Sequence, residues 1–106
     1  MKPITQEKLK EMIDNNEGFV LVNVLPKESF DQKHIPGSIS IPISEDFDSE
    51  VQKQIPNKDT KVIVYCANTE CQASPNAAKQ LDELGYSDVY DYEAGLAEFC
   101  MSNECA

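Results

Sequence analysis

The four cysteines of this chain stand in two pairs of equal spacing, and no other residues in it point so clearly to chemistry. Cys66 and Cys71 form one Cys-x4-Cys pair, and Cys100 and Cys105 form the other. The first residues do not resemble a secretory signal, so the disulfide framework of a small secreted protein is not expected. In a reducing compartment, reactive or metal-binding thiols are the better expectation.

The residues around the first pair predict a strand, a loop and a helix. Apart from Lys61, the run at 61–65 is apolar, as in a strand that a sheet buries on both faces. The segment 74–85 reads as a helix, with Ser74 as N-cap and Pro75 at the first helical position. Cys66 is therefore expected at the carboxyl end of a buried strand, where open α/β sheets bind their ligands.

The rest of the chain continues this alternation of strands and helices. Apolar or β-branched stretches predict further strands at 19–24, 39–43 and 88–92. Apolar stripes and capping residues predict helices at 5–18 and 44–55, a helical turn or two at 27–34, and a final helix from 94. We expect an α/β fold with a mostly parallel sheet of about five strands and helices on both faces. One domain should span 1–106, with a short flexible tail at about 101–106.

The charge of the chain excludes some classes of partner. Its 106 residues carry a net charge of −10, so no basic surface is expected that could bind nucleic acid or an anionic membrane. The same charge repels small dianionic substrates. No stretch is long and apolar enough to cross a membrane, and a cytoplasmic protein is the expectation.

At the end of such a strand, the environment of Cys66 would favour its reactive form. Backbone N–H groups of the loop and the positive end of the following helix both stabilise a thiolate, which is the nucleophilic state of cysteine. The alternative is a buried structural cysteine, since free cysteine is among the most buried residue types.

Four segments together resemble the rhodanese-like family of sulfurtransferases, over about residues 9–99. VLVNV resembles the first core strand of that family, and VIVYC resembles the strand that carries its catalytic cysteine. HIPGSISIP, residues 34–42, is similar to its most recognisable turn. LGYSDVYDYEAGLAEF is similar to its closing segment. The resemblance implies a three-layer sandwich formed by a single domain.

The resemblance also implies sulfur transfer. Cys66 would take sulfane sulfur from a small donor or a protein persulfide, hold it as a persulfide, and pass it to a thiol or other nucleophilic acceptor, without metal or organic cofactor. His34, the only histidine, is expected to be structural because it belongs to the turn. The loop backbone would stabilise the persulfide anion through the N–H groups of Ala67, Asn68, Thr69, Glu70, Cys71, Gln72 and Ala73.

Departures from the family limit the substrate. Residues 66–78 contain no basic side chain, Glu70 adds a negative charge, and the loop is longer than the common form. Thiosulfate is therefore expected to be a poor donor. Gln72 stands where phosphatases of this architecture need arginine, so phosphate-ester hydrolysis is not expected. Two further departures are Asn23-Val24-Leu25 in place of Asp-Val-Arg, and Ala94 in place of the first of two glycines.

Several alternatives stay open from the sequence. Cys71 could resolve the Cys66 persulfide, act as a redox switch, or pack under the loop as a bystander. Cys100 and Cys105 could belong to the tail, or complete a four-thiolate zinc site that would turn the chain into a scaffold. A non-catalytic module for binding or redox sensing is the remaining alternative. The sequence leaves the donor, the acceptor, the pathway and the oligomeric state undetermined.

Overall fold

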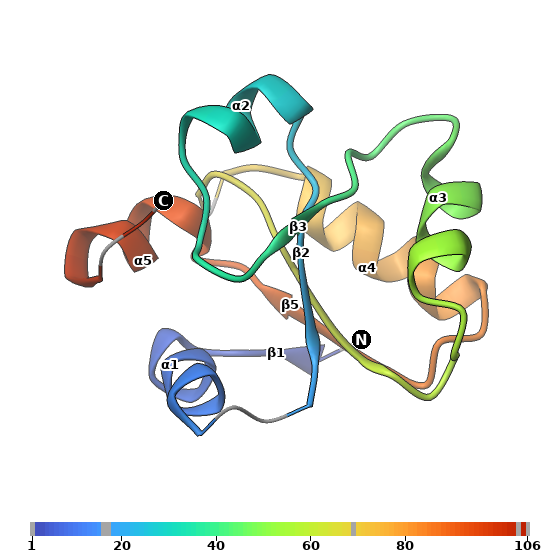
Figure 1. Cartoon of the computed structure of the whole chain (residues 1–106), viewed down its shortest axis with the longest axis horizontal. Helices are drawn as coiled ribbons and strands as arrows, with labels where there is room; N and C mark the ends of the chain where they lie inside the picture. Colours follow the sequence, from blue (N-terminus) through green and yellow to red (C-terminus); the bar gives the residue numbers. More distant parts are fainter. Residues whose placement is uncertain (1, 16–17, 69, 104, 106) are drawn as a thin grey trace.

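A five-stranded parallel sheet runs through the centre of the computed structural model, which describes residues 2–15, 18–68, 70–103 and 105 (Figure 1). The strand order is β1-β5-β4-β2-β3, and the neighbouring strands of the described sheet are all parallel. The strands are β1 (Lys2–Pro3), β2 (Val20–Asn23), β3 (Ile39–Ser40), β4 (Lys61–Tyr65) and β5 (Asp88–Tyr92). The helices are α1 (Gln6–Asp14), α2 (Lys27–Gln32), α3 (Phe47–Gln54), α4 (Ala73–Glu83) and α5 (Gly95–Ser102). The predicted α/β architecture is confirmed.

Each face of the sheet has its own apolar core. Helices α3 and α4 cover one face, where Phe47 and Leu81 pack against the alternate residues Val62 and Val64 of β4. Helices α1 and α5 cover the other face. The core there contains Leu9, Met12, Leu21, Ile35, Ile63, Tyr65, Tyr92 and Phe99. Because both faces are buried, β2 and β4 are apolar at nearly every position, as parallel strands require.

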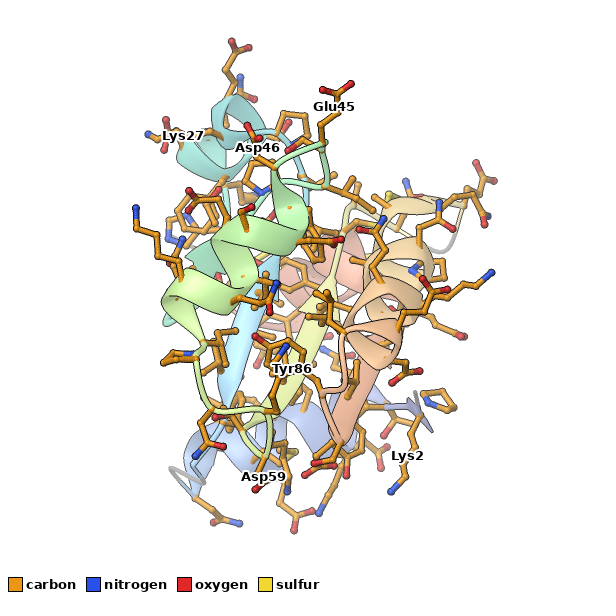
Figure 2. All side chains as sticks on the ribbon, turned by 90° about the vertical axis from the view of Figure 1, so that its right-hand side faces the viewer. Lys2, Lys27, Glu45, Asp46, Asp59 and Tyr86 are labelled. Atoms are coloured by element: carbon orange, nitrogen blue, oxygen red, sulfur yellow. A yellow bond between two sulfur atoms is a disulfide. The ribbon has the colours of Figure 1, made fainter. Side chains whose placement is uncertain are left out.

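All strands run in the same direction, so their carboxyl ends meet at one edge. Figure 2 looks onto the face that α3 and α4 cover, with Tyr86 labelled between them. Lys27 and Asp46, which follow β2 and β3, lie at one end of this view, and Asp59, which precedes β4, lies at the opposite end. The loop that leaves β4 therefore belongs to the end where ligands of parallel sheets bind.

Some element boundaries differ from the sequence prediction. Strand β1 was not predicted, because it has only two exposed residues and pairs with β5 at the edge of the sheet. The N-cap prediction is confirmed for Thr5, whose hydroxyl accepts the Lys8 N–H. It is wrong for Ser74, because α4 already begins at Ala73, and the Ser74 side chain is buried in the first turn.

Two further observations concern the helices. Within the described ranges, no helix has the length and apolar character needed to span a bilayer. The last helix, α5, includes Met101 and Ser102 of the segment expected to be a tail, and Met101 is 86% exposed.

Candidate active site at the β4–α4 loop

Cys66 lies directly after β4, at the carboxyl end of a strand flanked by β2 and β5. Its side chain is only 1% exposed. Its sulfur is bonded to that of Cys71, whose Cα lies 6.4 Å from the Cα of Cys66. The structure thus presents the oxidised form of this pair, and the two sulfurs of the loop are within reach of each other. Both interpretations in which Cys71 reacts with Cys66 require this proximity.

The loop between the two cysteines is shaped by Asn68. The side-chain Oδ1 of Asn68 accepts the Glu70 N–H at 3.0 Å, and its backbone carbonyl accepts the Cys71 N–H at 3.2 Å. Two of the N–H groups expected to face a persulfide are therefore engaged within the loop in this form. Thr69, which was also expected in the cradle, lies outside the described residues. For the other amides between 67 and 73 the cradle stays a prediction.

The start of α5 packs directly against the loop backbone. The N–H groups of Leu96 and Ala97 donate to the carbonyls of Cys66 and Ala67, at 2.8 and 2.9 Å. Gly95 makes this approach possible: its φ is +76°, and a Cβ there would lie 2.7 Å from the Cys66 carbonyl oxygen. The glycine that the family pattern retains is the one the packing needs. Ala94, at the position where the chain departs from the family, has a φ of −64° and needs no glycine.

A buried hydrogen-bond network holds the residue before Cys66. The Tyr65 hydroxyl accepts the side-chain N–H of Asn23 and the backbone N–H of Ile35, both at 3.1 Å. Ser38 Oγ lies 2.8 Å from the same oxygen, and it donates its own proton to the Ile35 carbonyl. The phenol therefore donates to Ser38. Asn23, which replaces the family's aspartate, supplies an N–H that a carboxylate lacks.

The network joins the turn at 34–38 to the strand that carries the cysteine. His34, in the same turn, has a different partner: its ring stacks on Phe30, with centroids 3.9 Å apart, and its Nδ1–H donates to the Phe30 carbonyl at 2.8 Å. These contacts agree with the structural role expected for His34.

Two polar residues near Cys66 were not predicted to belong to the site. Ser74 is 1% exposed, and its Oγ lies 3.6 Å from the Cys66 sulfur. Asp91, on β5, is also 1% exposed, and neither carboxylate oxygen has a hydrogen-bond partner in the described structure. Burial raises the pKa of Asp91, the Ser74 hydroxyl lowers it by a smaller amount, and the charge of Glu93 raises it. The sequence does contain a signal for a buried carboxylate: Asp91 stands two positions after Val89, on the same face of a strand that helices cover on both sides.

Two hollows flank the loop. One, of about 270 Å³, is lined by Cys71, Gln72, Ser74, Pro75 and Glu93. The other, of about 390 Å³, is lined by Lys33, Ala67, Asn68, Leu96, Ala97, Cys100 and Met101. The first hollow contains an acidic residue and the second a basic one. Lys33 directly follows the last residue of α2, so the loop has a cation nearby that its own sequence lacks.

The second cysteine pair is also bonded. Cys100, in α5, and Cys105 form a disulfide with a Cα separation of 5.7 Å. Cysteines thus pair within each Cys-x4-Cys unit in this structure. Among the residues that the structure describes, no group of three or more His, Cys, Asp and Glu side chains is arranged to hold a metal ion.

Comparison with known proteins agrees with this architecture. The model of the rhodanese-like domain matches residues 5–102. The thiosulfate sulfurtransferase PspE of Escherichia coli is 31% identical over 80 residues, which are 76% of this chain and 73% of that protein. The HTH-type transcriptional regulator Rv0324 of Mycobacterium tuberculosis is 32% identical over 82 residues, 77% of this chain but only 34% of the regulator.

Solved structures agree on the fold. The rhodanese-like domain of the Alr3790 protein from Anabaena superposes with a TM-score of 0.87 at 22% identity, covering 100% of this chain and 79% of that one. The chain belongs to the rhodanese-like domain family. Its relatives include sulfurtransferases at low identity, and it spans only about a third of the length of the transcriptional regulator.

Proposed function

We propose that this protein is a sulfurtransferase that carries sulfane sulfur on Cys66. The observation that carries the proposal is the position of Cys66 in a rhodanese-like domain: it is buried, ends a central parallel strand, and precedes the first turn of α4. The positive end of α4 and the backbone N–H groups of the loop favour a thiolate at this place. The disulfide form has no free thiol, so sulfur loading starts from the reduced protein.

The proposed transfer has two steps. The Cys66 thiolate attacks the terminal sulfur of a donor persulfide, forms a new S–S bond, and releases the donor as a thiolate. The thiolate of an acceptor then attacks the terminal sulfur on Cys66, becomes a persulfide, and returns Cys66 to its thiolate. Both steps conserve charge and require no electron donor. No metal or organic cofactor takes part.

The charges around the loop bear on the donor. Glu70 and Glu93 lie beside it, and the net charge of the chain is −10. Lys33 lines the hollow on the other side of the loop. One exposed lysine does not offset this field for a small dianion. A neutral donor or a protein persulfide therefore fits the site better than thiosulfate.

Cys71 is proposed as a second thiol that resolves the persulfide. Its thiol attacks the Cys66 sulfur of the persulfide, which forms the Cys66–Cys71 disulfide and releases hydrosulfide with the thiol proton. The support is the disulfide itself, which shows that the two sulfurs can meet. An external dithiol must then reduce the loop before another turnover. The same disulfide also supports a second candidate function, a redox-sensing module in which oxidation of the loop is the signal.

The mass of the intact protein tests the proposal. The reduced protein is measured under native and denaturing conditions, before and after incubation with a persulfide donor. The expected result is a gain of one sulfur atom on the peptide carrying Cys66. Cys66→Ser should abolish the gain, and Cys71→Ser should keep it but slow the release of hydrosulfide.

The other outcomes assign the alternatives. Equal loading of Cys66→Ser would contradict the assignment of the nucleophile. No gain of sulfur, together with a zinc-sized increment that denaturation removes, would identify the cysteines as metal ligands. No gain and no metal would leave a rhodanese-like binding module or, if mild oxidant closes the loop disulfide, a redox sensor.

A further inference from the structure

The two sulfurs of the loop disulfide differ in how far a second molecule can reach them. Cys66 is 1% exposed, whereas Cys71 is half-buried. Cys71 also lines the hollow of about 270 Å³ on one side of the loop, and Cys66 is not among the described residues that do. A thiol reduces a disulfide by attacking one of its two sulfurs, and access is one factor that decides which. An external thiol therefore meets the disulfide at Cys71.

Ser74 makes Cys66 the better leaving group of the two cysteines. Its Oγ lies 3.6 Å from the Cys66 sulfur, and its side chain is buried in the first turn of α4. A disulfide sulfur carries no proton, so the hydroxyl is the donor in this contact. A hydrogen bond to the departing sulfur stabilises it as a thiolate, and a sulfur that is stabilised in this way leaves faster. Access and leaving-group stability thus both direct an incoming thiol to Cys71.

The charges at the hollow restrict the thiol that can enter it. Glu93 lines the hollow, Glu70 is exposed directly before Cys71, and no basic residue is found among the described residues of its lining. The attacking species is itself a thiolate, so it carries one negative charge into this field. A further negative charge on the same molecule adds repulsion, and a positive charge offsets it.

We propose that Cys71 is the sulfur at which an external dithiol reopens the loop, with Cys66 leaving as a thiolate. The partner is a dithiol whose reactive end is neutral or positive apart from the attacking thiolate. Ser74 touches the departing sulfur and is a catalytic residue of this step, whereas Glu93 determines its specificity.

The reaction has two steps whose atoms and electrons balance. A thiolate of the dithiol attacks the Cys71 sulfur and forms a mixed disulfide, while the Cys66–Cys71 bond breaks and Cys66 takes the electron pair. The second thiolate of the partner then attacks the partner's sulfur in the mixed disulfide, closes the partner's own disulfide, and releases Cys71 as a thiolate. The dithiol is oxidised by two electrons and the loop is reduced by two. The two protons that the dithiol loses equal those that the two loop thiols carry.

This step rests on the proposed function, since both the sulfurtransferase and the redox sensor have to reopen the loop. The order of events has a chemical consequence. Attack at Cys71 leaves Cys66 as a thiolate, which is the state that attacks a sulfur donor. The nucleophile is therefore restored in its reactive form, while the half-buried thiol carries the adduct.

Trapping the mixed disulfide identifies the attacked sulfur. The oxidised protein is mixed with mercaptoethanol, a monothiol that has no second thiol with which to resolve its adduct, and the reaction is quenched early with N-ethylmaleimide. Cleavage after Glu70 places the two loop cysteines in different peptides, separate from Cys100 and Cys105. The expected result is mercaptoethanol on Cys71 and maleimide on Cys66. Mercaptoethanol mainly on Cys66, or a loop that mercaptoethanol does not open, would overturn the proposal.

Three monothiols of different charge test the role of Glu93. The rate of loop opening is compared between wild type and Glu93→Gln for uncharged mercaptoethanol, anionic mercaptoethanesulfonate and cationic cysteamine, so that the intrinsic reactivity of each thiol cancels. Glu93→Gln should speed the anionic thiol and slow the cationic one, each by about two- to threefold, and leave the uncharged one unchanged. The matched control is Glu83→Gln at the opposite end of α4, which should change none of the three rates. An equal change for all three thiols, or no change, would overturn the selection by charge.

Ser74→Ala tests the leaving group. Loss of the hydrogen bond should slow opening by mercaptoethanol by about two- to tenfold. Loosening of the loop alone would speed the opening, so a slower rate reports the loss of the hydrogen bond. An unchanged or faster rate would overturn the role of Ser74.

Sulfur loading is measured separately, by the mass of the intact protein. Attack at Cys71 in a protein that never gains sulfur would support this entry point and refute the sulfurtransferase, which leaves the redox sensor. Attack at Cys66 in a protein that gains sulfur on Cys66 would do the reverse.

Discussion

Replacing Tyr65 by phenylalanine removes one oxygen atom from the centre of a buried network. Tyr65, Asn23 and Ile35 are all fully buried, and Ser38 is 9% exposed. Burial raises the pKa of Tyr65, so its hydroxyl stays protonated and donates to Ser38. The ring itself fits the same space in the variant, so the change isolates the hydroxyl.

The magnitude follows from the groups that lose a partner. Two buried donors, the Asn23 side-chain N–H and the Ile35 N–H, both 3.1 Å from the Tyr65 oxygen, are left unsatisfied. Each unsatisfied buried donor costs about 1–3 kcal/mol. Local relaxation recovers part of this, so Tyr65→Phe should lower the free energy of unfolding by about 2–4 kcal/mol.

Equilibrium unfolding in urea measures this loss. An unchanged m-value, the slope of the unfolding free energy against urea concentration, indicates that the unfolded state is unaltered. The matched control is Tyr92→Phe, because the Tyr92 hydroxyl makes one part-buried contact, to Glu98 at 3.3 Å. That variant should lose less than about 1 kcal/mol. Ser38→Ala combined with Tyr65→Phe should cost less than the sum of the single changes, since both belong to one network. A loss below about 1 kcal/mol for Tyr65→Phe would refute the account of the network.

Two further predictions concern stability. Gly95→Ala should destabilise the protein at least twice as much as Gly37→Ala in the same urea assay. Both glycines have positive φ, which costs alanine about 1–2 kcal/mol, but of the two only Gly95 would bring its Cβ into collision with the loop backbone. Equal losses would contradict the packing of α5 on the loop. Asp91→Asn should stabilise the disulfide form at neutral pH and do so less below about pH 4. The folded-state pKa of Asp91 is raised above its unfolded value of about 3.9, so the folded protein loses stability as the pH rises between the two values, and asparagine escapes that loss. A gain that is independent of pH would contradict this linkage.

The sequence predicted the sheet better than the site. The runs at 19–24 and 61–65 are mostly apolar, so their burial between two layers of helices could be read directly. The first strand, Lys2–Pro3, was missed because two exposed residues carry no periodicity, and only the edge of β5 makes them a strand. The local sequence predicts a strand that has its own run of apolar residues. It does not predict a strand such as β1, which forms only because it pairs with an adjacent strand.

The site depends on contacts that spacing does not encode. The capping signals at Ser74 and Pro75 placed the helix start two residues too late, and the buried hydroxyl of Ser74 faces Cys66 instead of capping α4. Asp91 is 25 positions further along the chain than Cys66. The parallel pairing of β4 with β5, which sets Asp91 beside Val64, brings it close to the site. The proximity of the Cys66 and Cys71 sulfurs likewise depends on the path of the loop.

The hydrogen bonds from α5 to the loop also fix the orientation of peptide planes. A trans peptide is planar, with its N–H pointing opposite to its C=O. Since the carbonyls of Cys66 and Ala67 point at the N–H groups of Leu96 and Ala97, the N–H groups of the next residues, Ala67 and Asn68, must point away from α5. Helix α5 thus fixes the direction in which the first two amides after the cysteine can donate to an anion.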